Sequence, residues 1–346
     1  MKTTFVSNRS IMDAMRLSMM KMQSRLVDAQ KELASGRLAD VGKSLGQRTG
    51  QTVSLREEHA RLTTIVDTNT EVNTRLNITQ DALKHMVESA QKFVGELIGA
   101  RDTATAPAIV QKQAKSNLTD MVGALNTTLN GVYVFSGINT DVKPIADYFN
   151  DPAAPNRQAV ANAFTTAFGP SPDMSTITAA DMQAFLDGPF SDLFNDANWT
   201  SDWSSASDQN LRSRISTQEL VETSTNANEV AFRKLASAYT MLADLGAENL
   251  SKDAYQVVVD KALLVAGDAI SDLGKLQGNM GVVQGRVETS NETISLQLNV
   301  IATHIGALEN VDPYEAETRV STLLTQIETS YALTARIQKL SLLNYL

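Results

Sequence analysis

The 346-residue sequence has no cysteine, few aromatic residues and no long apolar run. The absence of cysteine excludes disulfides, thiolate metal ligands and cysteine nucleophiles. An aromatic content of 5% is low for a thick globular core and is typical of helical rods. No stretch of 18 apolar residues occurs, so we expect no transmembrane helix. The residues after Lys2 also lack the apolar region of a cleaved signal peptide.

Proline and net negative charge are scarce over most of the chain and are concentrated in its middle. Six of the eight prolines and both tryptophans lie within Ile138–Glu222. Residues 138–210 hold ten aspartates and no glutamate, against one lysine and one arginine, which is a net charge of −8 in a chain of −9. Such a shift in composition marks a separate unit. The sequence therefore predicts an acidic, exposed insert domain at 138–222, with two short helices near 156–168 and after Thr178 and a hairpin near 211–221.

Two seams of apolar residues at heptad spacing lie on either side of this segment. Such spacing, uninterrupted by proline, predicts long helices that pack against each other. Asn69 occupies one seam position, where an amide costs stability but fixes the register of the pair. Between the first seam and the insert, the pattern after Pro107 predicts a further helix through Val132. The seam residues are Leu55, Leu62, Asn69, Leu76 and Leu83 in the first seam, and Met280, Val287, Ile294, Ile301 and Leu308 in the second.

Each end of the chain carries one more helical stripe. Ser35-Gly36 ends the first helix, glycines at 42, 46 and 50 predict a loop, and Asp312-Pro313 begins the last helix. Both stripes mix apolar with hydroxyl residues, so each helix is predicted to need the surface of neighbouring subunits. Methionines make the first stripe an adaptable partner surface. The predicted subunit-assembly residues are Ile11, Met15, Met22, Leu26 and Leu33, with Val320, Leu323, Ile327, Tyr331 and Ile337.

The predicted fold is therefore mainly α. A long antiparallel helical rod or coiled coil is built from both chain ends, with a small α+β insert in the middle. The predicted domains are terminal assembly helices at 1–50 and 311–346, the rod at 51–137 and 223–310, and the insert at 138–222.

The residues that most enzymes need are missing or scattered. His59, His85 and His304 are far apart, each in a helical pattern, so no metal site is expected. No Walker A, G-x-S-x-G, H-E-x-x-H or EF-hand pattern occurs, and no cofactor is expected. No basic motif indicates nucleic acid, and no apolar hairpin of about 20 residues supports a membrane-inserting toxin or translocator. The sequence predicts a structural subunit rather than an enzyme.

Four stretches, in this order along the chain, resemble segments of the flagellin superfamily. Glu32–Leu38 resembles its L-S-S-G-x-R-I segment, and Gly281–Val287 resembles its L-G-x-x-Q-N-R-L segment. Within the superfamily, Gly131–Gly137 with Thr140–Pro144 is similar to the G-x-Y-x-F-S-G…T-x-x-x-P stretch of the hook–filament junction family, flagellar hook-associated protein 3. The ending Leu340–Leu346 is similar to the L-S-L-x-x-Y-L ending of that family.

The resemblance implies a self-assembling structural subunit of the bacterial flagellum, the organelle of motility. It implies secretion by the flagellar type III apparatus without a cleaved signal, and a place at the junction between hook and filament. The implied partners are neighbouring copies, the hook-side junction protein (hook-associated protein 1), flagellin, and a flagellar type III export chaperone. Neither nucleic acid nor membrane insertion is implied. The alternative is flagellin itself, the filament subunit.

Overall fold

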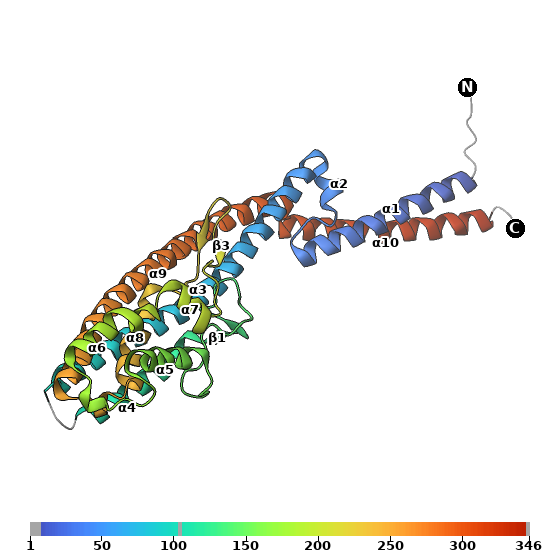
Figure 1. Cartoon of the computed structure of the whole chain (residues 1–346). Helices are drawn as coiled ribbons and strands as arrows, with labels where there is room; N and C mark the ends of the chain where they lie inside the picture. The colour runs from blue at the N-terminus through green and yellow to red at the C-terminus, as the bar shows by residue number, and fades with distance from the viewer. Residues whose placement is uncertain (1–7, 103–105, 344–346) are drawn as a thin grey trace. The chain divides into compact units, whose positions relative to one another are not determined.

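A computed structural model describes residues 8–102 and 106–343 of the chain (Figure 1). The chain forms two compact units, one up to Thr63 and from Ser295 onward, the other from Thr64 to Ile294. The boundary falls inside two long helices, α3 (Thr49–Ala100, 52 residues) and α9 (Lys252–Glu309, 58 residues). The predicted class is confirmed, since the structure is mainly helical, with long helices toward both ends and few strands in the middle.

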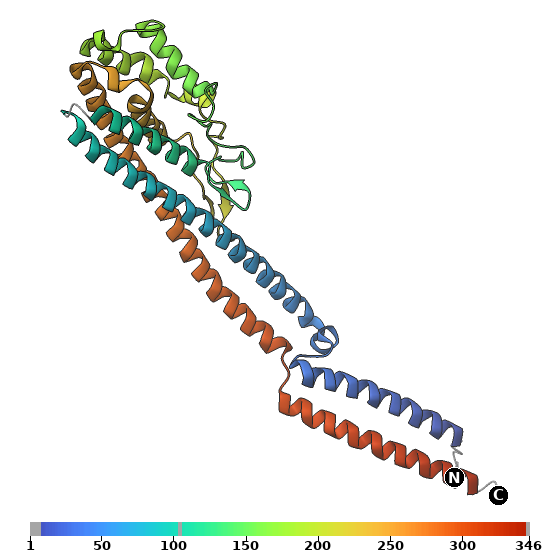
Figure 2. The ribbon, with the colours of Figure 1, turned by 90° about the horizontal axis from the view of Figure 1, so that it is seen from below.

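The first unit pairs the two outermost helices, α1 (Asn8–Ser35) and α10 (Pro313–Leu343). They lie antiparallel and side by side, drawn blue and red in Figure 2. The predicted boundaries at Ser35 and Pro313 are confirmed. The glycines after α1 do not make the predicted open loop. Two short helices, α2 (Val41–Leu45) and η1 (Gly46–Arg48), form there. Asp40 caps the first of them, since its carboxylate accepts the Lys43 backbone N–H at 2.9 Å.

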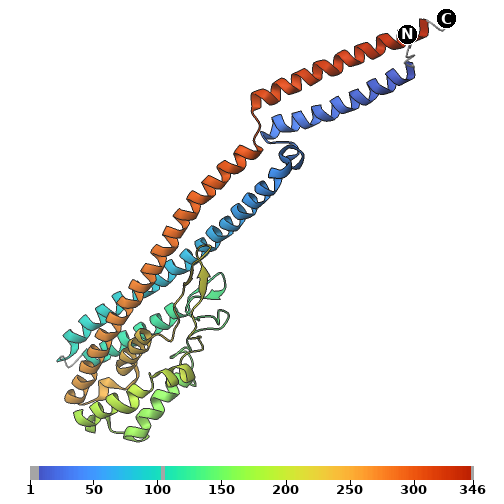
Figure 3. The same cartoon turned by 90° about the horizontal axis from the view of Figure 1, so that it is seen from above.

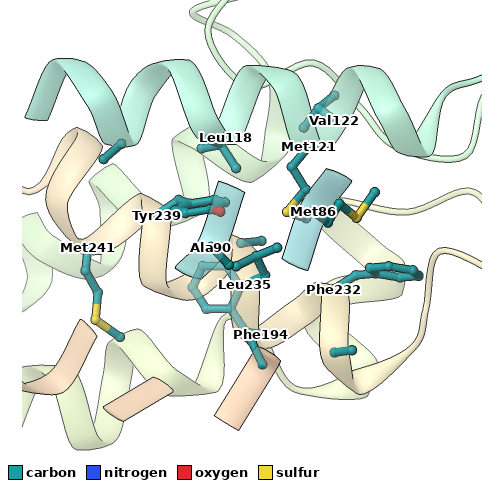
Figure 4. Close-up of a cluster of buried hydrophobic side chains, with 14 of the residues drawn as sticks. Met86, Ala90, Leu118, Met121, Val122, Phe194, Phe232, Leu235, Tyr239 and Met241 are labelled. Atoms are coloured by element: carbon teal, nitrogen blue, oxygen red, sulfur yellow. The ribbon is translucent and has the colours of Figure 1, made fainter. Parts of the chain in front are cut away.

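The second unit is built around α8 (Val230–Asp244), of whose 15 residues eleven are buried. It packs against α4 (Ala106–Leu125) and against α3. The ring of Phe93 on α3 meets that of Tyr239 on α8 edge-on, with centroids 5.1 Å apart. Figure 4 shows the centre of this core, where side chains of three helices meet: Met86 and Ala90 of α3, Leu118, Met121 and Val122 of α4, and Phe232, Leu235 and Tyr239 of α8.

Within the second unit α3 and α9 run antiparallel in a fixed register. The Asn69 amide donates to Asn291 Oδ1 at 2.7 Å, and Arg101 Nε donates to Asp260 Oδ1 at 2.6 Å. The step of 32 residues from Asn69 of α3 to Arg101, just past the end of α3, is thus matched by a step of 31 residues back along α9, from 291 to 260. Of the predicted seam residues, Leu62, Asn69, Leu76, Leu83, Met280, Val287 and Ile294 are buried, and Leu55, Ile301 and Leu308 are half-buried.

The acidic segment 138–222 contains the elements that the sequence predicts. The helices are α5 (Pro155–Phe168), η2 (Met174–Thr176), α6 (Ala179–Phe185), the π-helical turn η3 (Leu186–Phe190) and α7 (Asp196–Asp202). A hairpin follows, with β3 (Arg212–Arg214) antiparallel to β4 (Leu220–Glu222). None of the ten aspartates between 138 and 210 is buried, so the negative charge lies on the surface.

This segment does not form a unit of its own, in contrast to the predicted insert domain. Its buried aromatic side chains belong to the same apolar cluster as α4 and α8. Trp199 Nε1 donates to the Ala227 carbonyl at 3.1 Å, and the Tyr148 hydroxyl donates to Asp244 Oδ2 at 3.0 Å. Because α8 is buried on nearly every side, it needs cover beyond α3 and α4, and this segment contributes to that cover. Figure 3 shows the green helices of the segment beside α4 and α8.

The predicted helix through Val132 is wrong beyond Leu125. Helix α4 ends at Leu125, and a small hairpin follows, with β1 (Thr128–Leu129) paired to β2 (Val132–Tyr133). Asn130 and Gly131 both have positive φ, 52° and 81°, as a type I′ turn requires. The Asn-Gly pair is the local signal that overrides the helical spacing.

The fold predicts a large cost for a charge at Leu76, whose side chain is fully buried. Leu76→Asp should lower the free energy of unfolding by at least about 3 kcal/mol, because apolar burial is lost and a carboxylate is left unpaired. Denaturant unfolding followed by circular dichroism measures this. The control is Leu264→Asp, at a leucine of α9 that is 60% exposed, which should cost less than about 1 kcal/mol. Equal midpoints for the two variants would show that Leu76 is not a core residue.

Candidate assembly surface

The α1–α10 pair buries very little apolar surface. Among the described residues of α1 only Ala29 and Glu32 are buried, and among those of α10 only Ala316, Leu323 and Ile327. Part of the remaining contact is polar, since Gln23 Nε2 donates to the Tyr331 hydroxyl at 2.9 Å. A groove of about 520 Å³ beside this pair is lined mainly by Ser, Thr and Gln side chains. The two helices therefore leave most of their apolar side chains uncovered within the chain.

The structure divides the predicted assembly residues into three groups. Leu323 and Ile327 are each 8% exposed and are buried within the unit. Ile11, Leu33 and Tyr331 are exposed at 36, 39 and 51%. The others are half-buried: Met15, Met22, Leu26, Val320 and Ile337.

A second apolar stripe, which the prediction from the sequence did not include, lies on α1. Leu17, Met20 and Val27 are 56, 58 and 63% exposed, and their spacing of three and seven residues places them on one face of the helix. On α10, Leu324 lies seven residues before Tyr331 and is 43% exposed. This stripe is visible in the sequence as a second set of apolar residues offset from the predicted one, which is the more continuous of the two. These exposed stripes are the best-defined candidate surface for a partner.

The connections at the inner ends of α1 and α10 are joined by backbone hydrogen bonds. The Leu38 N–H donates to the Glu309 carbonyl at 2.8 Å, and the Val311 N–H donates to the Gly36 carbonyl at 2.9 Å. Gly36 has φ of +68°, a conformation that glycine adopts without strain. The chain leaving α1 is thereby fixed to the chain entering α10.

We call this connection between the inner ends of α1 and α10, residues 36–38 and 309–311, the joint. Two buried carboxylates, each paired with its own arginine, hold it in place. The Glu309 side chain is fully buried and accepts from both Nε and Nη2 of Arg56, the former at 2.8 Å. These bonds raise the pKa of Arg56 above its ordinary value. Glu32 accepts from Arg319 Nη1 at 2.8 Å and from the Ala39 backbone N–H at 3.3 Å. Bidentate and charge-assisted bonds of this kind fix geometry as well as adding stability.

Across residues 8–102 and 106–343, no three or more His, Cys, Asp or Glu side chains cluster closely enough to hold a metal ion. Over the same ranges, no helix has the length and apolar character needed to cross a membrane.

Comparison with known families gives matches at both ends of the chain. Residues 6–140 match the model of the bacterial flagellin N-terminal helical region, and residues 263–346 match that of the bacterial flagellin C-terminal helical region. The chain belongs to the flagellin superfamily. The resemblance seen in the sequence is thus confirmed, and the protein is a structural component of the flagellum that assembles with other flagellar subunits.

This flagellin-superfamily chain was also compared with solved structures. It is similar to a protein from Vibrio parahaemolyticus assigned as a flagellar hook-associated protein, with TM-score 0.52 and 10% identity over 76% of this chain and 97% of that one. FlgL of Bacillus cereus gives TM-score 0.47 and 10% identity over 74% and 98%. A search of curated proteins finds no match.

The joint predicts different effects for two arginines of α3. Arg56→Leu leaves the buried Glu309 carboxylate without its cation and should cost about 1–3 kcal/mol of stability. The control is Arg61→Leu, whose partner Glu58 is 38% exposed, and it should cost less than about 1 kcal/mol. Thermal unfolding followed by circular dichroism compares the two. If Arg56→Leu is no less stable than Arg61→Leu, the buried pair does not hold the joint.

The thin contact between α1 and α10 predicts fast amide hydrogen exchange there in the dilute monomer. Amides of α1 and α10 should exchange much faster than those of α8, because local opening exposes few buried side chains. The contrary result is that amides in 11–33 and 320–337 exchange as slowly as those in 230–244. It would show that the α1–α10 pair is stable without neighbouring subunits.

Proposed function

We propose that this flagellin-superfamily protein is the subunit of the junction between hook and filament. Two lines support the proposal. The stretches 131–144 and 340–346 resemble those of the junction family more than those of flagellins. The fold is shared with a protein assigned as a flagellar hook-associated protein over 97% of that protein's length.

The observation that carries the proposal is the structural role of the Gly131–Pro144 stretch. Gly131 makes the type I′ turn of the first hairpin, and the Tyr133 N–H donates to the Thr140 carbonyl at 2.9 Å. Phe135 is fully buried and packs edge-on against Phe232 of α8. At Gly137 a Cβ would lie 2.4 Å from the Ser207 carbonyl oxygen, so only glycine fits. The residue types of this pattern are therefore required by the turn, by the core and by this close approach.

We infer that subunits assemble because neighbouring copies cover the exposed apolar faces of the terminal helices. The exposed apolar side chains Leu17, Met20 and Val27 on α1, and Leu324 and Tyr331 on α10, would be covered by α1 and α10 of neighbouring copies, in coiled-coil packing. Each such side chain removed from water contributes up to about 1.5–3 kcal/mol. Residues 1–50 and 311–346 would form this assembly region, and the α3–α9 seams would hold the rod.

We propose four kinds of partner on the same basis. Copies of the chain would close a ring, with the hook-side junction protein on one side and flagellin on the other. Before assembly, the apolar face of α10 is suited to a groove-type contact with an export chaperone. The protein would leave the cell through the flagellar type III apparatus, and its role would be structural rather than enzymatic.

The second candidate function is that of flagellin, the filament subunit. The matches to the flagellin N- and C-terminal helical regions favour it as much as they favour the junction subunit. Assembly through terminal helices would be the same in both. The two functions predict different phenotypes for a strain from which the gene is deleted.

Electron microscopy of a deletion strain tests the proposal. A junction subunit predicts hooks without filaments and flagellin released into the medium. Hooks without filaments and with no secreted flagellin pool would assign the chain as flagellin. Complementation should succeed with the wild type and with Leu264→Ser, and fail with the triple variant Leu17→Ser, Met20→Ser and Val27→Ser, if that variant is secreted at wild-type level. Full complementation by the triple variant would show that the α1 stripe is not the assembly surface.

A further inference from the structure

The sulfur of this protein is distributed unevenly. The chain has no cysteine and twelve methionines, and five of these lie within eleven residues of α1. They are Met12, Met15, Met19, Met20 and Met22. A thioether that an oxidant can reach is converted to a sulfoxide, which turns a flexible apolar side chain into a polar one. The proposed assembly helix therefore carries an unusual concentration of oxidisable groups.

Exposure separates these five methionines from most of the others. Met20 is 58% exposed, and the other four are half-buried. In the second unit Met174 is half-buried, whereas the remaining methionines are at most 7% exposed: Met86, Met121, Met182, Met241 and Met280. A dissolved oxidant would thus reach the sulfur atoms of α1 while those of the core are shielded by packed side chains.

We propose that the methionine cluster of α1 is a site of reversible oxidation that controls subunit contact. Hydrogen peroxide or an organic hydroperoxide would supply the oxygen. The thioether sulfur attacks one peroxide oxygen, the O–O bond breaks, and the sulfur loses two electrons as it becomes a sulfoxide. The second oxygen takes up the proton of the transferred oxygen and leaves as water or as the alcohol. A methionine sulfoxide reductase reverses the change.

The consequence differs on the two sides of the helix. Met22 lines the groove beside α10, whose other lining side chains include Ser18, Thr325 and Ser330. A sulfoxide oxygen there can accept a hydrogen bond from a hydroxyl, so the α1–α10 pair tolerates oxidation. Met20 lies on the exposed stripe with Leu17 and Val27, where a neighbouring subunit would have to bury the new polar oxygen. Oxidation therefore weakens association and leaves the fold of the monomer intact. This consequence rests on the proposed assembly function.

The first test is the order of oxidation in the full-length monomer. Limiting hydrogen peroxide is added, and peptide mapping by mass spectrometry follows each methionine. The methionines of α1 should be converted at least about tenfold faster than those of α8 and α4, because the latter react only when the core opens. Similar rates at Met20, Met121 and Met241 would overturn the assignment of the site. This result does not depend on what the protein assembles with.

The second test measures association before and after oxidation. Binding to hooks isolated from the deletion strain is followed by co-sedimentation, and self-association by sedimentation velocity. Full conversion of the α1 methionines should weaken association about tenfold or more, with unchanged helicity, and a methionine sulfoxide reductase should restore it. Unchanged association after full conversion would overturn the proposal.

Two variants make the test specific. Replacing all five α1 methionines by leucine keeps volume, apolarity and helix propensity while removing the sulfur. This variant should associate like the wild type and be insensitive to peroxide. The matched control is Met174→Leu, which removes a half-buried methionine outside α1 and should remain sensitive. Failure of the untreated wild type to bind hooks would count against the junction function, while the order of oxidation and self-association would still decide this proposal.

Discussion

The burial of α8 on nearly all sides is the constraint on which the second unit depends. A helix with eleven of its 15 residues buried must be covered on several faces, so one neighbour is not enough. Helices α3 and α4 cover part of it, α9 contacts it through the Lys234–Asp272 pair, and the aromatic side chains around Trp199 and Phe194 belong to the same apolar cluster. The acidic segment is consequently part of the core that α8 organises, although its composition and its surface charge set it apart in the sequence.

Most of the helices could be predicted from the sequence because their signals are local or periodic. The heptad spacing from Leu55 onward, the stop at Ser35-Gly36 and the start at Asp312-Pro313 correspond to observed helices or helix ends. The hairpin at Asn130-Gly131 was missed because a two-residue turn was weighed against a longer apolar pattern, and the turn chemistry prevailed. The merging of the acidic segment with the core was not predictable from composition, because composition reports exposed charge and says little about where buried aromatics pack.

The candidate surface was predictable only in part, and for a related reason. A single stripe of apolar residues on α10 combines Leu323 and Ile327, which are buried within the unit, with Tyr331, which is exposed. Helical spacing defines a face but does not say which half of it a partner within the same chain will cover. The buried pairs Glu309–Arg56 and Glu32–Arg319 were likewise invisible, since their members lie more than 250 residues apart. The joint between the outer helices is thus fixed by polar contacts, whereas the second unit is fixed by apolar ones.

The surface aspartates of residues 138–210 have an effect that no single contact shows. Asp187 and Asp196 are paired with Lys261 and Arg233 from outside this stretch, and the remaining excess of aspartate gives its surface a local negative field. Two copies that approach through this part repel each other over about 8 Å at physiological ionic strength. The segment therefore acts as an electrostatic spacer, which disfavours contacts through its own face and keeps concentrated, unassembled chains in solution.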